Sequence, residues 1–479
     1  MGMQIPEKVR WILDRLKENG FEGYAVGGCV RDSVMGRKPG DWDITTSAKP
    51  EEVKKVFQRT IDTGIAHGTV TVMIGGEGFE VTSYRLDGEY EDHRHPKHVA
   101  FTPNLEEDLK RRDFTINAMA YNPETGIVDL FGGMKDIEQK CIRCVGNAVE
   151  RFTEDALRML RGVRFAGQLG FEIEDETLRA IRACSHTITK VSAERIRVEL
   201  TKLLMSKQPE KLLLAEKTGL CQSFFPEFTT MLCTEQDNPH HCYNVGIHSI
   251  QTVKHVQRLY GQLKGTHESE CCLSPYADGF PEEKVDSILV FAAMLHDVGK
   301  TVCKTTDPDG VDHFYGHDAR GCEIADAILR RLRFDNDTIR IVTDVIRFHE
   351  RRHDGRRRTM RRLISKSGTE VMPYLFLLQE ADVCSQSDHE REEKLACIAE
   401  ARQMYSDICS AKEPVGIRDL AVTGTDIVAL GLSPGPEIGR ILRLLLEIVI
   451  EDPSKNDQKL LLTEAAKHIK IENECSRRE

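Results

Sequence analysis

Two aspartates one residue apart, Asp41 and Asp43, lie in the stretch GDWDITT, which is typical of a β-strand. Successive strand side chains point to opposite faces, so we expect both carboxylates on one side and Trp42 packed against the core on the other. Carboxylates this close repel one another unless a cation lies between them, and their oxygens suit Mg²⁺. The pair predicts either a magnesium site or an exposed polar strand edge.

A glycine turn precedes this pair. The stretch YAVGGCVRD predicts a strand, a turn at Gly27 and Gly28, and the start of a helix with Arg31 in its first turn. Backbone N–H groups at such a turn can hold an anion. A plain tight turn is the alternative, but an anion turn followed by a carboxylate pair is a more specific combination than either feature alone.

Arginines recur at every third position in EDALRMLRGVRFAGQLG, a segment with a strong helical pattern, as Arg158, Arg161 and Arg164. The apolar residues between them predict that the opposite face of the helix is buried. One interpretation is an exposed charged face in which Glu154 and Arg158 form an i,i+4 pair worth a few tenths of a kcal/mol. The other is a nucleotide-binding face.

Hydrogen-bonding chemistry favours the second interpretation for Asp155 and Arg158. A carboxylate only accepts hydrogen bonds and a guanidinium only donates them. Side by side, they would match a base that presents an amino group beside a ring nitrogen, as cytosine and adenine do. Uracil and guanine present a carbonyl in place of the amino group, and each unmatched buried group costs about 1–3 kcal/mol. The pair therefore predicts selection of C and A without a nucleic-acid template.

Histidines and aspartates recur in order through the second half of the chain. His296 and Asp297 are adjacent in FAAMLHDVGKT, at the end of an apolar run. A single helical histidine is more often structural, but imidazole and carboxylate ligands in this mixture suit Mg²⁺ or a divalent transition metal. The ordered set predicts a metal centre; its other members are His248, His317, His349 and Asp382.

Arginine is concentrated in RRHDGRRRTMRR, residues 351–362, where seven arginines accompany one aspartate. This run predicts either a solvated helix face or contact with an RNA backbone, and we weigh the two equally.

The elements that must position these residues change along the chain. Residues 4–20, 50–59 and the strand-like stretches VTVMIGG and FEVTSYR predict an α/β unit of about 140 residues, and the pattern after Phe152 is helical. Residues 261–284 are predicted to form an exposed insertion. The fold class is therefore α+β, with a mixed sheet followed by helical units.

Composition narrows the class of protein. The chain has 479 residues and a formal charge of -11, which excludes a uniformly basic nucleic-acid coat but not a local basic groove. We find no apolar run long enough to span a bilayer and no secretory signal. The 15 scattered cysteines, including the single C-x-x-C of Cys141 and Cys144, are typical of reduced thiols rather than a zinc site. We expect a cytoplasmic protein with no obligatory protein partner.

The motifs resemble a known family. VGGCVRD followed by GDWDITT is similar to the nucleotidyltransferase superfamily. DGEYEDHRHPKHVAFTPNLEEDLKRRDFTINAMA and EDALRMLRGVRFAGQLGF narrow the resemblance to class II tRNA nucleotidyltransferases and poly(A) polymerases, whose bacterial members include CCA-adding enzymes. The resemblance implies a polymerase β-like catalytic head (residues 1–145), a helical neck (146–208), a body (209–400) and a tRNA-binding tail (401–479), for which LAVTGTDIVALGLSPGPEIGRIL is similar to the family.

The resemblance also implies roles for residues of the head and neck. Asp41 and Asp43 would bind catalytic Mg²⁺ together with Glu80 of FEVTSYR, the position that fits a third carboxylate. Asp113 and Asn117 are expected to be local turn or cap residues. Residues 87–96 resemble a flexible loop that favours complete CCA or A addition, with an ordinary surface loop as the alternative. The expected nucleotide-binding residues are Gly27, Gly28, Arg31, Arg112, Asp155, Arg158, Arg161 and Arg164.

The histidine-rich set resembles the HD phosphohydrolase superfamily. The resemblance implies a divalent ion such as Mn²⁺, Ni²⁺ or Co²⁺ on His248, His296, Asp297 and Asp382. It implies that His317 and His349 are further ligands or phosphate contacts. A phosphodiesterase or phosphatase activity is expected from such a domain.

The leading expectation is a CCA-adding enzyme acting on CTP, ATP and the tRNA 3′ end. A poly(A) polymerase or A-only enzyme of the same family is the nearest alternative. A protein of another class, an HD phosphohydrolase whose N-terminal domain only binds nucleotide, is disfavoured by the pairs Asp41/Asp43 and Asp155/Arg158.

Overall fold

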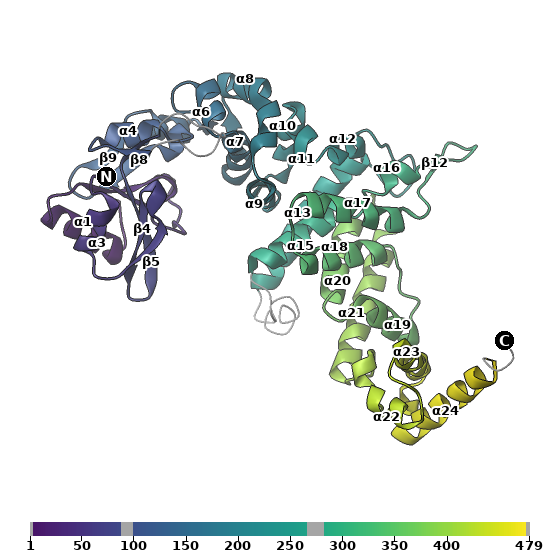
Figure 1. Cartoon of the computed structure of the whole chain (residues 1–479). Helices are drawn as coiled ribbons and strands as arrows, with labels where there is room; N and C mark the ends of the chain where they lie inside the picture. The colour runs from purple at the N-terminus through teal and green to yellow at the C-terminus, as the bar shows by residue number, and fades with distance from the viewer. Residues whose placement is uncertain (1–2, 88–98, 266–281, 476–479) are drawn as a thin grey trace. The chain divides into compact units, whose positions relative to one another are not determined.

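The computed structural model describes residues 3–87, 99–265 and 282–475. Two compact units share the chain: residues 1–229 with 331–334, and residues 230–330 with 335–479 (Figure 1). The loop at residues 87–96 lies outside the described residues except for Asp87, as does most of the insertion at 261–284. The domain boundaries expected from the sequence remain a prediction.

A mixed seven-stranded sheet forms the centre of the first unit. Its strand order is β3-β4-β5-β2-β1-β8-β9, and β2 pairs with β5 in parallel while the other neighbours are antiparallel. The predicted α+β class with a mixed sheet is confirmed. The strands are β1 (Gly23–Val26), β2 (Ile44–Thr46), β3 (Thr60–Gly64), β4 (Thr69–Ile74), β5 (Glu77–Ser83), β8 (Met119–Asn122) and β9 (Gly126–Asp129).

Helices α1 (Glu7–Glu18) and α3 (Pro50–Val56) cover the sheet beside β4 and β5 (Figure 1). Leu16 and Val53 from these helices join Val70 and Val81 from the strands in one buried cluster. Helix α2 (Gly28–Val34) packs on β1 and β8 in a separate cluster. Trp42 lies against both clusters, as its position between the two aspartates predicts.

The aspartate pair is not inside a strand, and the prediction was wrong on this point. Strand β2 begins at Ile44, so Asp41 and Asp43 lie in the segment that enters it. The Asp43 carbonyl still accepts a hydrogen bond from the Val26 N–H at 3.0 Å, which ties this segment to the end of β1. The aspartate pair is thus held beside the end of strand β1, where the glycine turn begins.

Short elements and helices complete the first unit. The sequence predicted one helix running through Asp155, but α6 ends before Asp155 and α7 starts after it. These elements are β6 (Arg85–Asp87), β7 (Val99–Phe101), α4 (Leu105–Lys110), α5 (Gly133–Glu138), β10 (Cys141–Ile142), α6 (Ala148–Glu154), α7 (Leu157–Leu169), β11 (Glu172–Ile173), α8 (Asp175–Cys184), α9 (Ala193–Leu204), α10 (Leu212–Lys217), α11 (Cys221–Phe224) and α12 (Glu227–Leu232), which crosses into the second unit.

The second unit is helical apart from one small hairpin. Helices α15 and α20 are buried almost all round, and α13 packs against both of them. The elements are α13 (Val245–Gly265), α15 (Glu282–Leu295), α16 (Lys300–Cys303), β12 (Thr305–Thr306), β13 (Asp312–His313), α17 (His317–Arg331), α18 (Asn336–Phe348), α19 (Arg357–Ser367), α20 (Met372–Ser385), α21 (Arg391–Ser410), α22 (Gly424–Ala429), α23 (Pro436–Glu451) and α24 (Gln458–Cys475).

The arginine run joins α19 to the C-terminal helices. Arg361 is buried, donates to the carbonyls of Ile450 and Glu451 at 2.9 and 3.3 Å, and pairs with Glu413 at 2.8 Å. Arg357 also pairs with Glu413. Part of the run is therefore neither a solvated face nor available to RNA, because acidic groups of this unit neutralise it.

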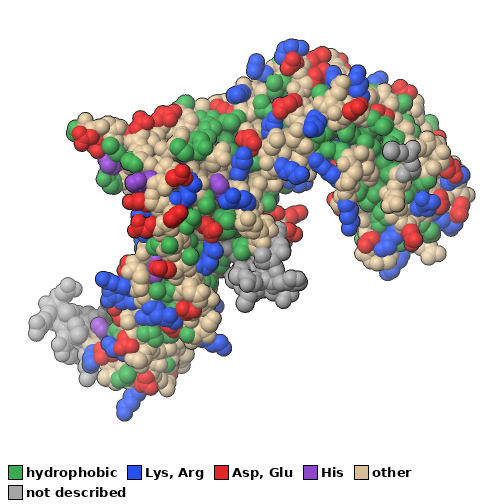
Figure 2. Space-filling model, turned by 180° about the vertical axis from the view of Figure 1, so that it is seen from behind, with side chains coloured by type: hydrophobic (Ala, Val, Ile, Leu, Met, Phe, Trp, Pro, Cys, Tyr) green, Lys and Arg blue, Asp and Glu red, His purple; other side chains and the backbone are tan. Residues whose placement is uncertain are grey.

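Basic and acidic side chains are interspersed on the face seen in Figure 2. Within the described ranges, no helix is long and apolar enough to cross a membrane.

Candidate active site and metal centre

A cavity of about 440 Å³ in the first unit brings most of the predicted nucleotide-binding residues together. Asp43 lines it as well, whereas Asp41, Glu80 and Arg164 do not. The predicted residues that line it are Gly27, Gly28, Arg31, Arg112, Asp155, Arg158 and Arg161, and residues not predicted as site members are Arg111, Asp113, Asn117, Phe165 and Arg195.

The glycine turn and the start of α2 bring Arg31 to the cavity. Gly27 has φ +82°, a conformation that favours glycine, and a side chain there would meet Arg112. Its N–H donates to the Met119 carbonyl at 3.2 Å, so the prediction that both glycine amides face an anion was wrong for Gly27. Arg31 is buried and donates to Asn117 Oδ1 at 2.8 Å. Its guanidinium is fixed at the wall of the cavity.

Arg112 adds a second cation to this wall. Its Nη2 donates to the buried Asp108 carboxylate at 3.3 Å. Its Nε is buried and has no hydrogen-bond partner in the part of the chain that the structure describes. A buried donor without a partner costs free energy, and a phosphate oxygen is a suitable acceptor.

The three predicted catalytic carboxylates interact electrostatically. The parallel register aligns Ile44 with Val81, which places Asp43 beside Glu80 on the neighbouring strand. Partial burial raises the pKa of Asp43, Arg112 opposes the rise, and the negative charges of Glu80 and Asp41 add to it. These oxygen ligands carry excess negative charge, so they fit a divalent cation.

Asp113 and Asn117 are more than the local turn residues expected from the sequence. Asp113 is buried and accepts two hydrogen bonds from Arg161, at 2.9 and 2.7 Å, and a third from Asn117 Nδ2 at 3.2 Å. Burial alone would raise the pKa of Asp113, but Arg161 and Asn117 outweigh it and lower the pKa to about 2. A chain of polar contacts therefore runs from Arg31 through Asn117 and Asp113 to Arg161.

The predicted base-reading pair has separate partners. Arg195 of α9 donates to both Asp155 oxygens, at 3.3 and 2.7 Å. Arg158 donates to Glu154 at 2.5 Å, the predicted i,i+4 contact, and to the Arg111 carbonyl at 2.9 Å. Arg158 is only 9% exposed, so an exposed charged face is the wrong interpretation here. Both groups line the cavity at fixed positions.

Arg164 lies on the same helix but away from the cavity. Its Nε donates to the buried Glu199 at 2.7 Å, and its guanidinium lies 3.7 Å from the centre of the Phe165 ring. Arg164 therefore does not face the cavity itself but contacts Phe165, which lines it.

In the second unit, the six predicted HD residues converge. His296, His317 and His349 each pair their Nδ1 with a backbone carbonyl, of Ala293, Phe314 and Ile346, at 2.9, 2.8 and 2.6 Å. A carbonyl only accepts, so each Nδ1 carries a proton, and Nε2 is the atom that each ring offers to a metal ion once that nitrogen is deprotonated. This tautomer is the one that metal-binding histidines use.

The Nε2 atoms of the four histidines lie close to one another and to two carboxylates. His248 Nε2 lies 3.3 Å from His296 Nε2 and 2.9 Å from Asp382, while His317 Nε2 lies 3.5 Å from His349 Nε2. Asp297 joins both groups, at 3.3 Å from His296 through one oxygen and 3.5 Å from His317 through the other. The donors form two adjacent groups that share Asp297, which fits one or two divalent ions.

Electrostatics and packing support this arrangement. Burial opposes protonation of His296, but the carboxylates outweigh it and raise its pKa to about 10, so the potential at the centre is negative. Gly299 lets α17 approach closely, because a Cβ there would lie 2.0 Å from the His317 carbonyl oxygen. Lys300, which the sequence interpretation missed although it lies three residues after Asp297, donates to that carboxylate at 2.8 Å.

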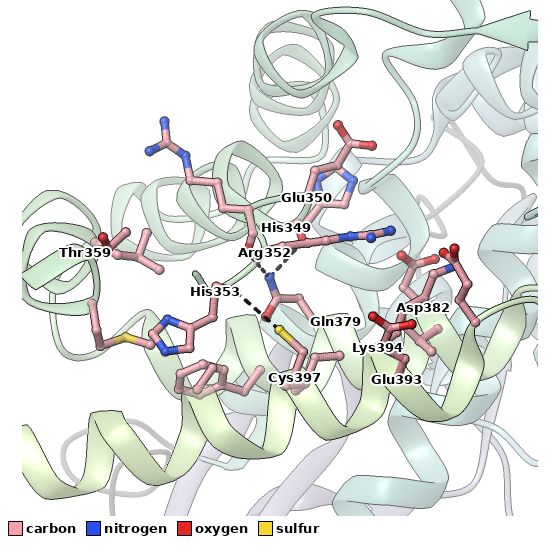
Figure 3. A pocket seen from close by; sticks show the side chains of 18 of the residues that line it. His349, Glu350, Arg352, His353, Thr359, Gln379, Asp382, Glu393, Lys394 and Cys397 are labelled. Atoms are coloured by element: carbon pink, nitrogen blue, oxygen red, sulfur yellow. Dashed lines mark hydrogen bonds between the residues drawn. The ribbon is translucent and has the colours of Figure 1, made fainter. Parts of the chain in front are cut away.

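A larger cavity of about 690 Å³ opens beside this centre, with His349 and Asp382 in its wall (Figure 3). Gln379 Nε2 donates to the carbonyls of His349 and Arg351 at 2.9 and 3.1 Å. These bonds hold the segment after α18 against α20.

Comparisons with known proteins cover most of the chain. Family models match the poly A polymerase head domain over residues 23–143 and an RNA- and SrmB-binding region of polymerase A over 170–232. Others match an HD domain over 245–387 and a second domain of tRNA nucleotidyltransferases over 321–465. The head and HD domains imply a dependence on divalent metal ions.

Curated relatives and solved structures agree with these matches. A CCA-adding enzyme of Lactococcus lactis subsp. cremoris (strain MG1363) is 32% identical over 465 residues, 96% of each chain. One from Ligilactobacillus salivarius is 52% identical over 42% of this chain and 50% of its own length. The structure of a Bacillus stearothermophilus CCA-adding enzyme with CTP matches 98% of this chain and 100% of its own, with 25% identity and a TM-score of 0.66. A Thermotoga maritima CCA-adding enzyme complexed with tRNA shares the fold at 19% identity, a TM-score of 0.54 and coverage of 97% and 96%.

Proposed function

Because the chain belongs to the CCA-adding enzyme family and is a nucleotidyltransferase with an HD domain, we propose that it adds CMP and AMP to the tRNA 3′ end without a template. The observation that carries this proposal is the single cavity in which Arg31, Arg112 and Asp43 of the head meet Asp155 and Arg158. CTP in the Bacillus structure and tRNA in the Thermotoga structure support these substrates. The tail at residues 401–479 is the proposed tRNA-binding part.

In the proposed reaction, the terminal tRNA hydroxyl gives up its proton to solvent as its oxygen attacks the α-phosphorus, the bond to the leaving oxygen breaks, and pyrophosphate departs. Arg31, fixed by Asn117, and Arg112, with its unpartnered Nε, hold the triphosphate. Mg²⁺ bound by Asp41, Asp43 and Glu80 would supply a Lewis acid for the hydroxyl and the phosphate charge.

Base selection rests on the neck. Asp155 accepts from the amino group of cytosine or adenine, and Arg158 donates to the ring nitrogen. Arg195 and Glu154 hold these two side chains in position, so a mismatched base cannot turn them without breaking an ion pair.

An extension assay tests this function. The full-length protein is incubated with Mg²⁺, with tRNAs that end before CCA, after C or after CC, and with one NTP at a time. We expect CTP alone to extend the first two tRNAs and ATP alone to extend only the third. Addition of ATP to a tRNA that lacks both C residues would favour the alternative, a poly(A) polymerase or A-only enzyme.

The HD centre carries a second proposed activity, hydrolysis of phosphate esters. The converging Nε2 atoms and the Asp297 that joins them support it. Mn²⁺, Ni²⁺ or Co²⁺ on His248, His296, Asp297 and Asp382, with His317 and His349 as further contacts, would polarise the ester phosphate. Water oxygen bonds to phosphorus, the P–O ester bond breaks, and a proton from water goes to the departing oxygen.

Hydrolysis of 2′,3′-cyclic nucleotides and of simple phosphate esters by the purified protein, with each of the three metals in turn, tests this second activity. Release of product with at least one metal is expected. No hydrolysis of either ester with any metal would refute it.

A further inference from the structure

Asp108 of α4 is a buried carboxylate that the proposed mechanism does not use. None of its side chain is exposed, although burying a charge costs free energy unless the charge is paired. Its partners Arg111 and Arg112 follow at the third and fourth positions, where a helical turn brings side chains together. Both arginines line the nucleotide cavity, whereas Asp108 does not. Asp108 can therefore act on a nucleotide only through the side chains that it holds.

Both oxygens of Asp108 accept hydrogen bonds. Oδ1 accepts from Nε and Nη2 of Arg111, at 3.1 and 2.7 Å. Oδ2 accepts from Arg112 Nη2 at 3.3 Å and from the Thr45 hydroxyl at 3.1 Å. A carboxylate has about four lone-pair positions, so these donors saturate it. Burial raises the pKa of Asp108, but the two arginines outweigh burial and lower the pKa, so the carboxylate is charged at neutral pH.

The contact with Arg112 fixes a phosphate-binding group. Arg112 Nη2 is held by Asp108, and Gly27 lies beside Nη1, because a Cβ added to that glycine would lie 3.2 Å from this nitrogen. The orientation of the planar guanidinium is therefore set, while its buried Nε has no hydrogen-bond partner within the described residues. Asp108 compensates one of the two positive charges that it contacts. The cluster of Asp108, Arg111 and Arg112 thus keeps a positive charge and a donor for an oxygen of the triphosphate.

The contact with Thr45 connects this cluster to the proposed magnesium ligands. Thr45 lies in β2, two positions after Asp43, and is fully buried. Its hydroxyl also lies 3.2 Å from a carbonyl of β5, the strand that carries Glu80. Asp108 therefore joins Arg112, which holds the triphosphate in the proposed reaction, to the segment that carries Asp43.

The contact with Arg111 reaches the base-reading pair. Asp108 holds the Arg111 side chain through two nitrogens, and the Arg111 carbonyl accepts from Arg158 Nη2 at 2.9 Å. Arg158 is the residue proposed to donate to the ring nitrogen of the base. A displacement of Arg111 would therefore move one of the acceptors that hold Arg158 in place.

We propose that Asp108 is a positioning residue for nucleotide transfer: it orients Arg112 toward the triphosphate and, through Arg111, holds Arg158 for base reading. The proposal rests on the proposed function and adds a residue to its mechanism. If Asp108 only stabilised the end of α4, its loss would weaken the fold without regard to which ligand is bound. Ligands that differ in the number of phosphates or in the base therefore distinguish the two roles.

The first test compares CTP with CMP. The full-length protein and its Asp108→Asn variant are titrated with CTP in the presence of Mg²⁺ and without tRNA, and CMP is measured by competition with CTP. The variant should raise the Kd of CTP about tenfold, as loss of a charge-assisted hydrogen bond does, and the Kd of CMP at most about threefold. The difference is expected because CMP lacks the outer phosphates that Arg112 would contact.

Asp136→Asn is the matched control for this test. Asp136 is also buried, accepts from the Thr115 hydroxyl at 2.6 Å and pairs with Arg143 at 3.2 Å, but neither it nor these partners line the nucleotide cavity. This variant should leave both Kd values within about twofold of those of the unchanged protein. A loss for CTP in Asp108→Asn that equals the loss for CMP, or that Asp136→Asn reproduces, would overturn the proposal.

The second test uses Arg111→Lys, which keeps the positive charge but cannot make the two-nitrogen contact with Asp108. Because this contact acts on the base, the Kd values of CTP and CMP should both rise about threefold, while the Kd of UTP stays nearly unchanged. An equal rise for UTP, or no rise for CTP, would overturn the link through Arg111.

A third variant, Thr45→Val, decides the role of Asp108 if Asp108→Asn does not fold. It nearly keeps the shape of the side chain and removes one hydrogen bond to Asp108, so it should weaken CTP about threefold more than CMP. Equal weakening of the two ligands would overturn the proposal. Extension of tRNA by the unchanged protein is a separate result: absence of CMP addition would refute the proposed function, while the dependence of Kd on the number of phosphates would still decide the role of Asp108.

Discussion

Arg195 donates to both carboxylate oxygens of Asp155, at 3.3 and 2.7 Å, although 40 positions separate the two residues in the chain. This ion pair connects α9 to the junction between α6 and α7. Arg158 pairs with Glu154 instead of Asp155. The two members of the proposed base-reading pair are therefore each held by a different neighbour. Base selection in this account depends on four charged side chains, not two.

Substitution of Asp155 tests base selection. Asp155→Ala should reduce the preference for CTP over UTP about tenfold or more, because the amino group of cytosine loses its acceptor while uracil loses a repulsive contact. Arg195→Ala should reduce it less, since Asp155 remains but is no longer fixed. The ratio of kcat/KM for the two nucleotides on a tRNA that ends before CCA measures the effect. Arg182→Ala, an exposed arginine on α8, is the control, and undiminished discrimination by Asp155→Ala would refute the base-reading role.

Substitutions of the carboxylates test the magnesium site. Asp43→Asn should lower the rate of nucleotide transfer at least about 100-fold, because it removes a charge that the cation requires. Glu80→Gln should raise the Mg²⁺ concentration needed for half-maximal rate with a smaller loss at saturation, since Glu80 does not line the cavity. Magnesium titrations of the extension rate measure both. If Glu80→Gln and the unchanged protein need the same Mg²⁺ concentration, Glu80 does not bind the cation.

Asp113 makes a pH-dependent contribution to stability. Its pKa falls from 3.8 to about 2 on folding, so its stabilising effect is complete above pH about 5 and is lost as pH falls toward 2. Asp113→Asn should lower the free energy of unfolding by about 3 kcal/mol at neutral pH, because a neutral amide replaces the carboxylate that accepts two hydrogen bonds from Arg161.

Both tryptophans, Trp11 and Trp42, lie in the head, so urea unfolding followed by tryptophan fluorescence reports on this unit. The gap between Asp113→Asn and the unchanged protein should narrow between pH 5 and pH 3. A gap that stays constant over this range would show that the Asp113 carboxylate does not titrate as the structure indicates.

The sequence predicted features that local spacing determines. Asp41 and Asp43, the glycine turn and the order of the HD residues are visible in short motifs, and the motifs also identified the family. Contacts between distant segments were not predictable in this way. In the sequence Arg195 looks like any arginine on a helix, and Asp113 looks like a turn residue because its partner Arg161 is 48 positions away.

The arginine run shows the same limit. Composition alone made solvent exposure and RNA contact equally plausible for residues 351–362, because the acidic partners Glu413 and Glu451 lie far along the chain. Packing of α19 on α23 decides which arginines are neutralised. The expected strand at Asp41 and Asp43 is a related case, since pairing of β2 with β5, a segment more than 30 positions away, begins only at Ile44.

Substitution of Arg361 should loosen the C-terminal helices. Arg361→Ala leaves the buried Ile450 carbonyl without its side-chain partner and leaves Glu413 with Arg357 alone, so a loss of about 3 kcal/mol is expected. Arg356→Ala, at an exposed position of the same run, should change stability by less than about 0.5 kcal/mol. Hydrogen exchange in α23 measures the difference. Equal protection of α23 in the two variants would contradict the role of Arg361.

The nucleotidyltransferase site and the HD centre should be separable by substitution. His296→Ala removes a predicted HD ligand and should abolish ester hydrolysis with Mn²⁺, Ni²⁺ or Co²⁺, while CCA addition with Mg²⁺ stays within about twofold. Asp43→Asn should give the reverse pattern. Product release from a cyclic nucleotide and extension of tRNA, measured on the same preparations, test this. Loss of both activities in His296→Ala with an intact fold would show that the centres are coupled.

The extension of tRNA by single nucleotides tests the central claim most directly. On a tRNA that ends before CCA, the account predicts that CTP alone adds two C residues, that ATP alone adds nothing, and that ATP completes the end once both are present. Incorporation of ATP without prior addition of C, or equal use of UTP and CTP, would contradict it.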